Sequence, residues 1–231
     1  MMAPVPGEIY AFLLDIAGED ETVNDPTSNV QNPTSRDSTA LTIVRIDLSQ
    51  LETLRAPRYQ VVMRRLWTGV KHTSIFGQIL ALAESWSPRY IVCDSTGVGA
   101  GIASFMVKVF GEGRVIPFIF TAKSKSELGW NIISVIETGR FQDYVSSNDP
   151  TLTIFQRQLE YCQSEILPGP GRMMRWSVPD GTRDPATGEL VHDDLIISAA
   201  LCSVLDEQTW GLAISEILPA SDPISTLDDT Y

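Results

Sequence analysis

The chain has 231 residues, of which 43% are hydrophobic and 20% are charged, so it is long enough for one large α/β domain or two small ones. No apolar run approaches the roughly 20 residues of a membrane-spanning helix, and we expect neither a membrane span nor a signal peptide. The net charge of −12 argues against a protein that holds nucleic acid mainly through its phosphates, because such proteins are usually basic.

The cysteines indicate the compartment in which the protein is found. There are three, Cys93, Cys162 and Cys202, and all lie in apolar segments without the spacing of a metal site. Because their number is odd, we interpret them as buried free thiols of a protein in a reducing compartment.

The secondary structure follows from the spacing of apolar residues. The expected strands are residues 8–16, 39–48, 59–68, 89–94 and 114–120. The expected helices are residues 72–86, 101–110, 124–137, 149–162 and 192–205. In the second of these helices, we expect Ile102, Phe105, Met106 and Val109 to face the core.

Three further segments are predicted to lie outside the regular core. Residues 18–38 are rich in Asp, Asn, Ser, Thr and Pro, which is typical of a long functional loop. Residues 168–191 combine turn residues with short β-like pieces and predict a hairpin. The chain after residue 210 is acidic, so we expect a domain at residues 1–210 and a loosely ordered tail at residues 211–231.

This order of elements predicts an α/β fold. Its mixed five-stranded sheet would combine an antiparallel three-strand meander with parallel strands, covered by helices on both faces, and the hairpin would be an addition. Ligand sites in such sheets lie beyond the carboxyl ends of strands. If residues 8–16 lie beside residues 89–94, the acids that end these two strands become neighbours.

Carboxylates stand at the ends of apolar elements in three places. Asp15 follows the apolar residues 9–14, and Asp94 follows residues 90–93. A third apolar element, the last expected helix, opens with His192, Asp193 and Asp194. A charge at the end of a buried strand is costly unless it is paired or binds something, although Asp is also a common turn residue. Three acids from separate segments favour a site of oxygen ligands for Mg²⁺ or Mn²⁺.

Several sequence motifs resemble those of a known family. The motifs are Asp94-Ser-Thr-Gly97-Val-Gly99, His192-Asp193-Asp194-x-x-x-Ser-Ala-Ala-Leu201, Thr121-Ala-Lys123-Ser-Lys125 and Ile136-Glu137-Thr-Gly139-Arg140. With the order of elements, they resemble the RNase H-like nucleases, and within them the C-terminal nuclease domain of the large terminase subunit of tailed bacteriophages. The run Asp15-Ile-Ala17-Gly18-Glu-Asp20 is one residue shorter than the family's D-x-A-x-G-x-D-like motif. The resemblance covers about residues 8–207.

The resemblance implies a two-metal endonuclease that cuts double-stranded viral DNA during genome packaging, with Mg²⁺ or Mn²⁺ as cofactor. We expect Asp15 to bridge two ions, Asp94 to hold one and Asp194 to hold the other. Adjacent acids on a helix point about 100° apart, so Asp193 is a second ligand, a group just outside the ligand set, or an acid that favours the helix dipole. Asp20 is a weaker candidate ligand and could equally be a loop acid.

The family also implies partners: an ATPase domain, the portal and the small terminase subunit, in the host cytoplasm. This chain lacks the nucleotide-binding pattern G-x-x-x-x-G-K-S/T, and its closest stretch, Gly97-Val-Gly-Ala-Gly101, has no lysine. The chain is therefore expected to be the nuclease part of a longer protein or the product of a split gene, and no ATPase activity is implied for it.

Several basic residues are candidates for contacts with the DNA backbone. Lys123 and Lys125 follow an expected strand and stand at the start of an expected helix, and Arg172 and Arg175 lie in the expected hairpin region. Each could instead be an ordinary solvated side chain. His192 could orient an acid or a water molecule, or could simply cap the helix.

Other functions remain open from the sequence alone. Another RNase H-like nuclease, such as a Holliday-junction resolvase or a ribonuclease H, would share the acids and differ in substrate. A nucleotide-binding protein would use the glycines of residues 97–101 for phosphate but would leave the acids of the last helix unexplained. A catalytically idle module that docks the portal or the small subunit is the third alternative.

Overall fold

A computed structural model describes residues 3–17, 38–97, 99–146 and 148–210, and its centre is a mixed sheet with the strand order β5–β4–β1–β2–β3–β6. The strands are β1 (Ile9–Asp15), β2 (Ser38–Asp47), β3 (Arg58–Thr68), β4 (Tyr90–Asp94), β5 (Val115–Phe118) and β6 (Phe141–Gln142). The first three form an antiparallel meander, and β4 and β5 run parallel to β1. The predicted fold class is confirmed; the short β6, parallel to β3, is a sixth strand that the sequence did not predict.

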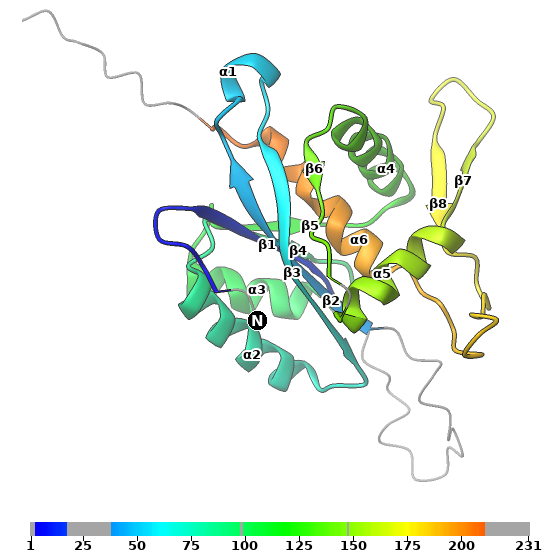
Figure 1. Ribbon diagram of the computed structural model, residues 1–231, viewed down its shortest axis with the longest axis horizontal. Coiled ribbons are helices and arrows are strands. Elements are labelled where there is room, and N and C mark those ends of the chain that lie inside the picture. Colours follow the sequence, from blue (N-terminus) through cyan, green and yellow to red (C-terminus); the bar gives the residue numbers. More distant parts are fainter. Residues whose placement is uncertain (1–2, 18–37, 98, 147, 211–231) are drawn as a thin grey trace, which may run out of the picture.

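Helices cover both faces of the sheet (Figure 1). One face carries α2 (His72–Trp86) and α3 (Gly99–Phe110), whereas the other carries α4 (Ala122–Glu137), α5 (Pro150–Tyr161) and α6 (Asp194–Ala200). The short α1 (Leu51–Leu54) connects β2 and β3. The helix expected at residues 192–205 is shorter than predicted, because α6 tightens into the 3₁₀ helix η3 (Leu201–Glu207).

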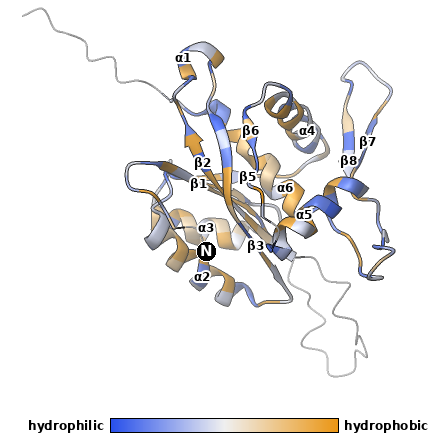
Figure 2. Cartoon of the chain, in the orientation of Figure 1, coloured by the Kyte–Doolittle hydropathy of each residue, from blue (hydrophilic) through white to orange (hydrophobic). Residues whose placement is uncertain are grey.

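Alternation along the central strands divides the core into two clusters. In β1, Ala11 and Leu13 face α6, whereas Phe12 and Leu14 face α2 and α3. Because both faces are covered, the strand is apolar throughout. Figure 2 shows these hydrophobic central strands and the more hydrophilic α5 at the periphery.

The prediction of which α3 residues face the core is partly wrong. Ile102 and Met106 are buried as expected, but Phe105 is 60% exposed and Val109 is 53% exposed. Ala103 is buried instead, so the face of α3 that packs on the sheet is narrower than the apolar pattern suggested.

The predicted hairpin exists, but its first strand lies elsewhere. It pairs β7 (Gln163–Ile166) with β8 (Met174–Ser177), whereas residues 168–191 were expected to supply both strands. Leu190 forms only an isolated bridge with Arg183. The hairpin packs against α4 at Gly129, where a Cβ atom would collide with the side chains of Met174 and Trp176. A glycine at this position lets the two elements approach closely.

Other expectations concern the ends of the chain and the thiols. The expected tail at residues 211–231, Asp20 and nearly all of the predicted loop at residues 18–38 lie outside the described residues. Cys93 and Cys202 are buried free thiols as predicted, but Cys162 is only partly buried. Within the described part of the chain, no helix is both long enough and apolar enough to cross a membrane.

Candidate active site

Asp15 and Asp94 end two neighbouring parallel strands. The last register pair between β1 and β4 is Leu14 with Cys93, so the two acids are the next residues of each strand. Leu13 and Val92, two residues earlier, face α6. Because strand side chains alternate, both carboxylates belong to this same face of the sheet. The prediction that these strands lie side by side is confirmed.

The loop after β4 fixes the position of Asp94. The backbone N–H of Thr96 donates a hydrogen bond of 2.8 Å to Asp94 Oδ1. At Gly99, the first residue of α3, a Cβ atom would lie 2.8 Å from the carbonyl oxygen of Asp94. The glycine therefore has a packing role beside an acid, and the nucleotide-binding interpretation is not needed to explain it.

Asp193 and Asp194 stand where α6 begins. Asp194 is the first residue of the helix and is 9% exposed, and Asp193 precedes it at the N-cap position. The helix packs across β1 and β2, which brings its N-terminal end to the carboxyl end of β1. Three segments far apart in the sequence thus deliver acids to one region.

A cavity of about 390 Å³ lies at this end of the sheet. Its wall includes Asp15 from β1, His192, Asp193 and Asp194 from the start of α6, and Asp180 from the connection after β8. Ser38, at the start of β2, lines it as well. The carboxylates therefore face a space that is large enough for ions and part of a substrate.

The electrostatics of this region follow from the crowding of acids. Burial, together with the nearby charges of Asp194, Asp94 and Asp193, raises the pKa of Asp15 well above its ordinary value of 3.8, and Lys125 opposes this shift. Burial also raises the pKa of Asp94, and the hydrogen bonds from Thr96 oppose it. Like charges and low solvent exposure both disfavour the ionised forms, so a nearby cation would stabilise them.

The side chains supply the correct kind of donor for a hard divalent cation. Carboxylate oxygens are the preferred ligands of Mg²⁺ and are accepted by Mn²⁺. As the described side chains stand, however, no three His, Cys, Asp or Glu residues are close enough together to hold one ion. The donor types fit a metal centre, and a bound cation would have to draw the mutually repelling carboxylates together.

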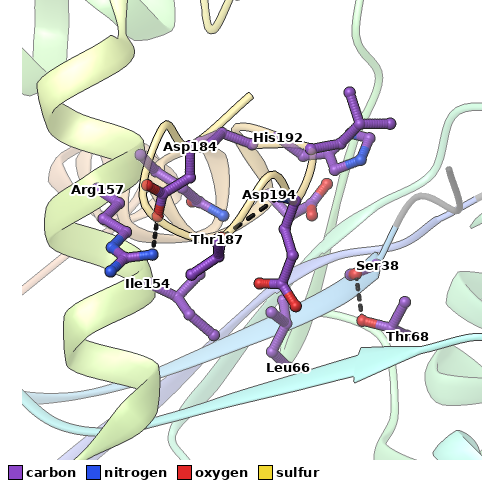
Figure 3. Close-up of a pocket in the computed structure, with 13 residues that line it drawn as sticks. Ser38, Leu66, Thr68, Ile154, Arg157, Asp184, Thr187, His192 and Asp194 are labelled. Carbon is purple, nitrogen blue, oxygen red and sulfur yellow. Dashed lines mark hydrogen bonds and ion pairs between the residues drawn. The ribbon is translucent and has the colours of Figure 1, made fainter. Parts of the chain in front are cut away.

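A second cavity, of about 270 Å³, adjoins the first on the side of α5 and shares Asp194 and His192 with it (Figure 3). Arg157 of α5 forms an ion pair with Asp184 in its wall, and Ser38 and Thr68 are hydrogen-bonded at 2.6 Å. Asp194 therefore lines both cavities.

The predicted basic residues have different surroundings. Lys125 belongs to the site, because its Nζ lies 3.3 Å from Asp193 Oδ2. Lys123 points elsewhere and pairs with Glu127 at 3.8 Å on the exposed face of α4. Arg172 and Arg175 are exposed on the hairpin, and Arg175 lies opposite Glu165 in the strand register.

Three residues near the site were missed by sequence reasoning. Asp180 lies in a turn in which Thr182 N–H bonds to Pro179 O at 3.1 Å and Gly181 has a φ of 77°. The Pro-Asp-Gly run predicts such a turn, but not its place beside the cavity. The buried polar residues Gln158 and Ser198 contact the backbone around the acids, and no local pattern distinguishes them from ordinary helix residues.

Comparison with known sequences gives one limited match. No protein-family model matches the chain. A segment of 89 residues is 29% identical to the probable terminase, ATPase subunit, of Haemophilus phage HP1. This match covers 38% of the chain but only 14% of the relative's length.

Similarity to solved structures extends over most of the chain. The large terminase nuclease of the thermophilic phage G20c, solved with bound magnesium, has a TM-score of 0.57 and 18% identity, covering 87% of this chain and 84% of that chain. The large terminase nuclease domain of Thermus phage P74-26 has a TM-score of 0.57 and 17% identity, covering 91% and 86%. The resemblance inferred from the motifs is thus confirmed, and this chain has the fold of the phage large-terminase nuclease domain.

Proposed function

We propose that this chain is a metal-dependent endonuclease that hydrolyses phosphodiester bonds of double-stranded viral DNA during genome packaging. The observation that carries the proposal is the pairing of β1 with β4, which places Asp15 and Asp94 side by side on the face covered by α6, whose first residue is Asp194. The shared fold supports a nuclease of the terminase type over the other RNase H-like nucleases.

The cofactor we propose is Mg²⁺ or Mn²⁺, bound as two ions. The G20c nuclease has been solved with magnesium and with cobalt, which supports divalent metals for this fold. When bound, two such ions would activate a water molecule and stabilise the leaving oxygen of the phosphodiester. Asp15 would bridge them, Asp94 and Asp194 would each hold one, and Asp193 would be a further ligand or would orient the site.

The other residues would hold and orient the DNA. Lys125, whose Nζ lies 3.3 Å from Asp193 Oδ2, would neutralise a phosphate bound beside these acids. Arg172 and Arg175, on the hairpin, would contact the DNA backbone. The second strand of this hairpin leads to Val178 in the cavity wall. Because Lys123 pairs with Glu127 on an exposed face, its contribution would be smaller.

In the whole protein, we propose that an ATPase domain, the portal and the small terminase subunit hold the DNA in place, in the host cytoplasm. The net charge of −12 supports a need for such partners, because the isolated chain would repel the phosphate backbone.

Plasmid cleavage by the wild-type chain and by Asp94→Asn, in Mg²⁺, in Mn²⁺ and in EDTA, tests the proposal. We expect nicking and linearisation that need a metal and are lost in the variant. Intact plasmid in every metal, at high protein concentration, would instead favour the idle docking module. Preference for branched DNA or for RNA–DNA hybrids would favour the resolvase or ribonuclease H alternative.

A further inference from the structure

The start of α6 is capped in an unusual way. Asp193 occupies the N-cap position, yet its side chain makes no capping hydrogen bond. The acceptor comes from α5 instead: Gln158 Oε1 accepts hydrogen bonds from the backbone N–H of Leu195, at 2.9 Å, and of Ile196, at 3.3 Å. Gln158 is only 2% exposed, so this contact is buried.

The first N–H groups of a helix have no partner within the helix and need one from outside. An Asp at the N-cap usually supplies it with its own carboxylate, which then turns toward the backbone of its own helix. Water is a poor substitute here, because Leu195 is fully buried and Ile196 is 8% exposed. Without Gln158, we expect the N-cap residue Asp193 to turn its carboxylate to these amides.

We propose that Gln158 is a positioning residue: it caps α6 in place of Asp193, and so leaves the Asp193 carboxylate turned toward the cavity, beside Asp194, to help bind divalent cations. This inference rests on the proposed metal-dependent function. The released Asp193 reaches α4, where its Oδ2 lies 3.3 Å from Lys125 Nζ.

A neutral amide suits this position. Gln158 lines the second cavity together with Asp194, so a carboxylate there would add another negative charge to a region already crowded with acids. Gln158→Glu would keep the capping acceptor, whereas Gln158→Met keeps the length of the side chain and removes the acceptor. These two variants separate capping from packing.

The first test is a Mn²⁺ titration of the whole chain, followed by the thermal unfolding midpoint. Loss of a residue that orients metal ligands typically weakens metal affinity by about tenfold or more, so Gln158→Met should raise the half-saturating Mn²⁺ concentration by about tenfold. Gln158→Glu should titrate like the wild type or at lower Mn²⁺. The control is Ser203→Ala, which removes a buried hydroxyl bonded to the carbonyl oxygen of Ala200 at the end of α6, and it should leave the titration unchanged.

A Gln158→Met titration that matches the wild type would overturn the inference. If the wild type itself shows no Mn²⁺-dependent shift, the proposed metal site is wrong. Whether Gln158 caps α6 in place of Asp193 is then decided by a second test, which needs no metal.

That second test measures hydrogen exchange of the Leu195 and Ile196 amides in EDTA. In Asp193→Ala the two amides should stay protected, because Gln158 still accepts from them. Fast exchange there would show that Asp193 is the true cap and would contradict the inference. In the Gln158→Met background, Asp193→Ala should lower the unfolding midpoint by about 2–4 °C more than in the wild type, which is the cost of losing the replacement cap. Additive effects of the two substitutions would also contradict it.

Discussion

The hydroxyl group of Ser198 donates a hydrogen bond to the backbone carbonyl oxygen of Leu13, with the two oxygen atoms 2.8 Å apart. Ser198 lies one helical turn after Asp194, and Leu13 lies two residues before Asp15. This buried contact, extended to Thr42 Oγ1 at 2.9 Å, holds α6 against β1, the strand that ends at Asp15.

Ser198→Ala should therefore affect both stability and cleavage. It leaves Thr42 without this partner in the core, which typically costs about 1–3 kcal/mol of unfolding free energy. It also loosens the placement of Asp194 relative to Asp15, so cleavage should fall at temperatures where the protein is still folded. Urea unfolding and plasmid cleavage at 20–25 °C measure the two effects.

Ser203→Ala is the matched control for that substitution. Ser203 is also buried, but its hydroxyl bonds to Ala200 O at 3.0 Å, within the same helical segment. Cleavage should be unchanged in this variant. Equal activity of both variants would mean that the Ser198 contact does not position Asp194.

Asp15→Asn should change how stability depends on pH in the absence of metal. The folded protein raises the pKa of Asp15 above 3.8, so this group contributes stability that is complete below about that value and is lost as the pH rises through the raised pKa. In EDTA at neutral pH, the variant should unfold at a higher temperature than the wild type, and the difference should disappear under acidic conditions.

Adding Mn²⁺ or Mg²⁺ should make the wild type, and not Asp15→Asn, the protein with the higher unfolding temperature. A bound cation stabilises the ionised Asp15, so the wild type should gain several degrees of thermal stability at neutral pH and Asp15→Asn much less. Calorimetric scans between pH 4 and 8, with metal and with EDTA, measure both effects. Parallel curves for the two proteins would mean that Asp15 is not the buried acid of a metal site.

Gly99→Ala should disturb the site through Asp94. The new methyl group would press on the carbonyl oxygen of Asp94 from 2.8 Å, and either the strand end or the start of α3 would have to move. Overpacking of this kind typically costs about 1–3 kcal/mol. We expect lower stability and a marked loss of metal-dependent cleavage.

Gly101→Ala provides the control on the same helix, because a Cβ atom there has no heavy atom within 4 Å. Replacing an exposed helix glycine with alanine usually stabilises a protein by about 0.5–1 kcal/mol. If Gly99→Ala were as stable and active as Gly101→Ala, the close packing beside Asp94 would have no functional role.

Arg172→Ala and Arg175→Ala should each weaken duplex DNA binding in a salt-dependent way. A lost phosphate contact reduces the slope of log affinity against log salt by about 0.9. Fluorescence anisotropy with a duplex between 50 and 200 mM salt measures that slope, with Ca²⁺ in place of Mg²⁺ to limit cleavage. Binding by the isolated wild-type chain should itself be weak, and nanomolar affinity at physiological salt would contradict the role assigned to its acidity.

Arg55→Ala is the control for the hairpin variants. Arg55 is exposed beyond α1, at the opposite end of β2 from Ser38 and the acidic cavity. Its removal should leave the salt slope unchanged. Equal slopes for all three variants would place the DNA away from the hairpin.

Local sequence patterns were sufficient to predict most of the fold. The unbroken apolar run before Asp15 predicted a strand covered on both faces. The alternating residues 39–48 predicted its antiparallel neighbour. Apolar spacing placed α2, α4 and α5, since a buried helix face repeats every three to four residues. The same patterns could not decide how much of α3 is covered, or which segment pairs with β8, because both depend on what packs against those residues.

The sequence by itself was also sufficient to nominate the acids of the candidate site. Asp15, Asp94, Asp193 and Asp194 were identifiable because each is a charge at the end of an apolar element. Only the tertiary structure decided that Asp15 and Asp94 are neighbours, that Lys125 reaches Asp193, and that Gln158 and Ser198 hold α6 in place. These relationships join residues 37 to 185 positions apart, and a contact between distant segments leaves no periodic pattern in the local sequence.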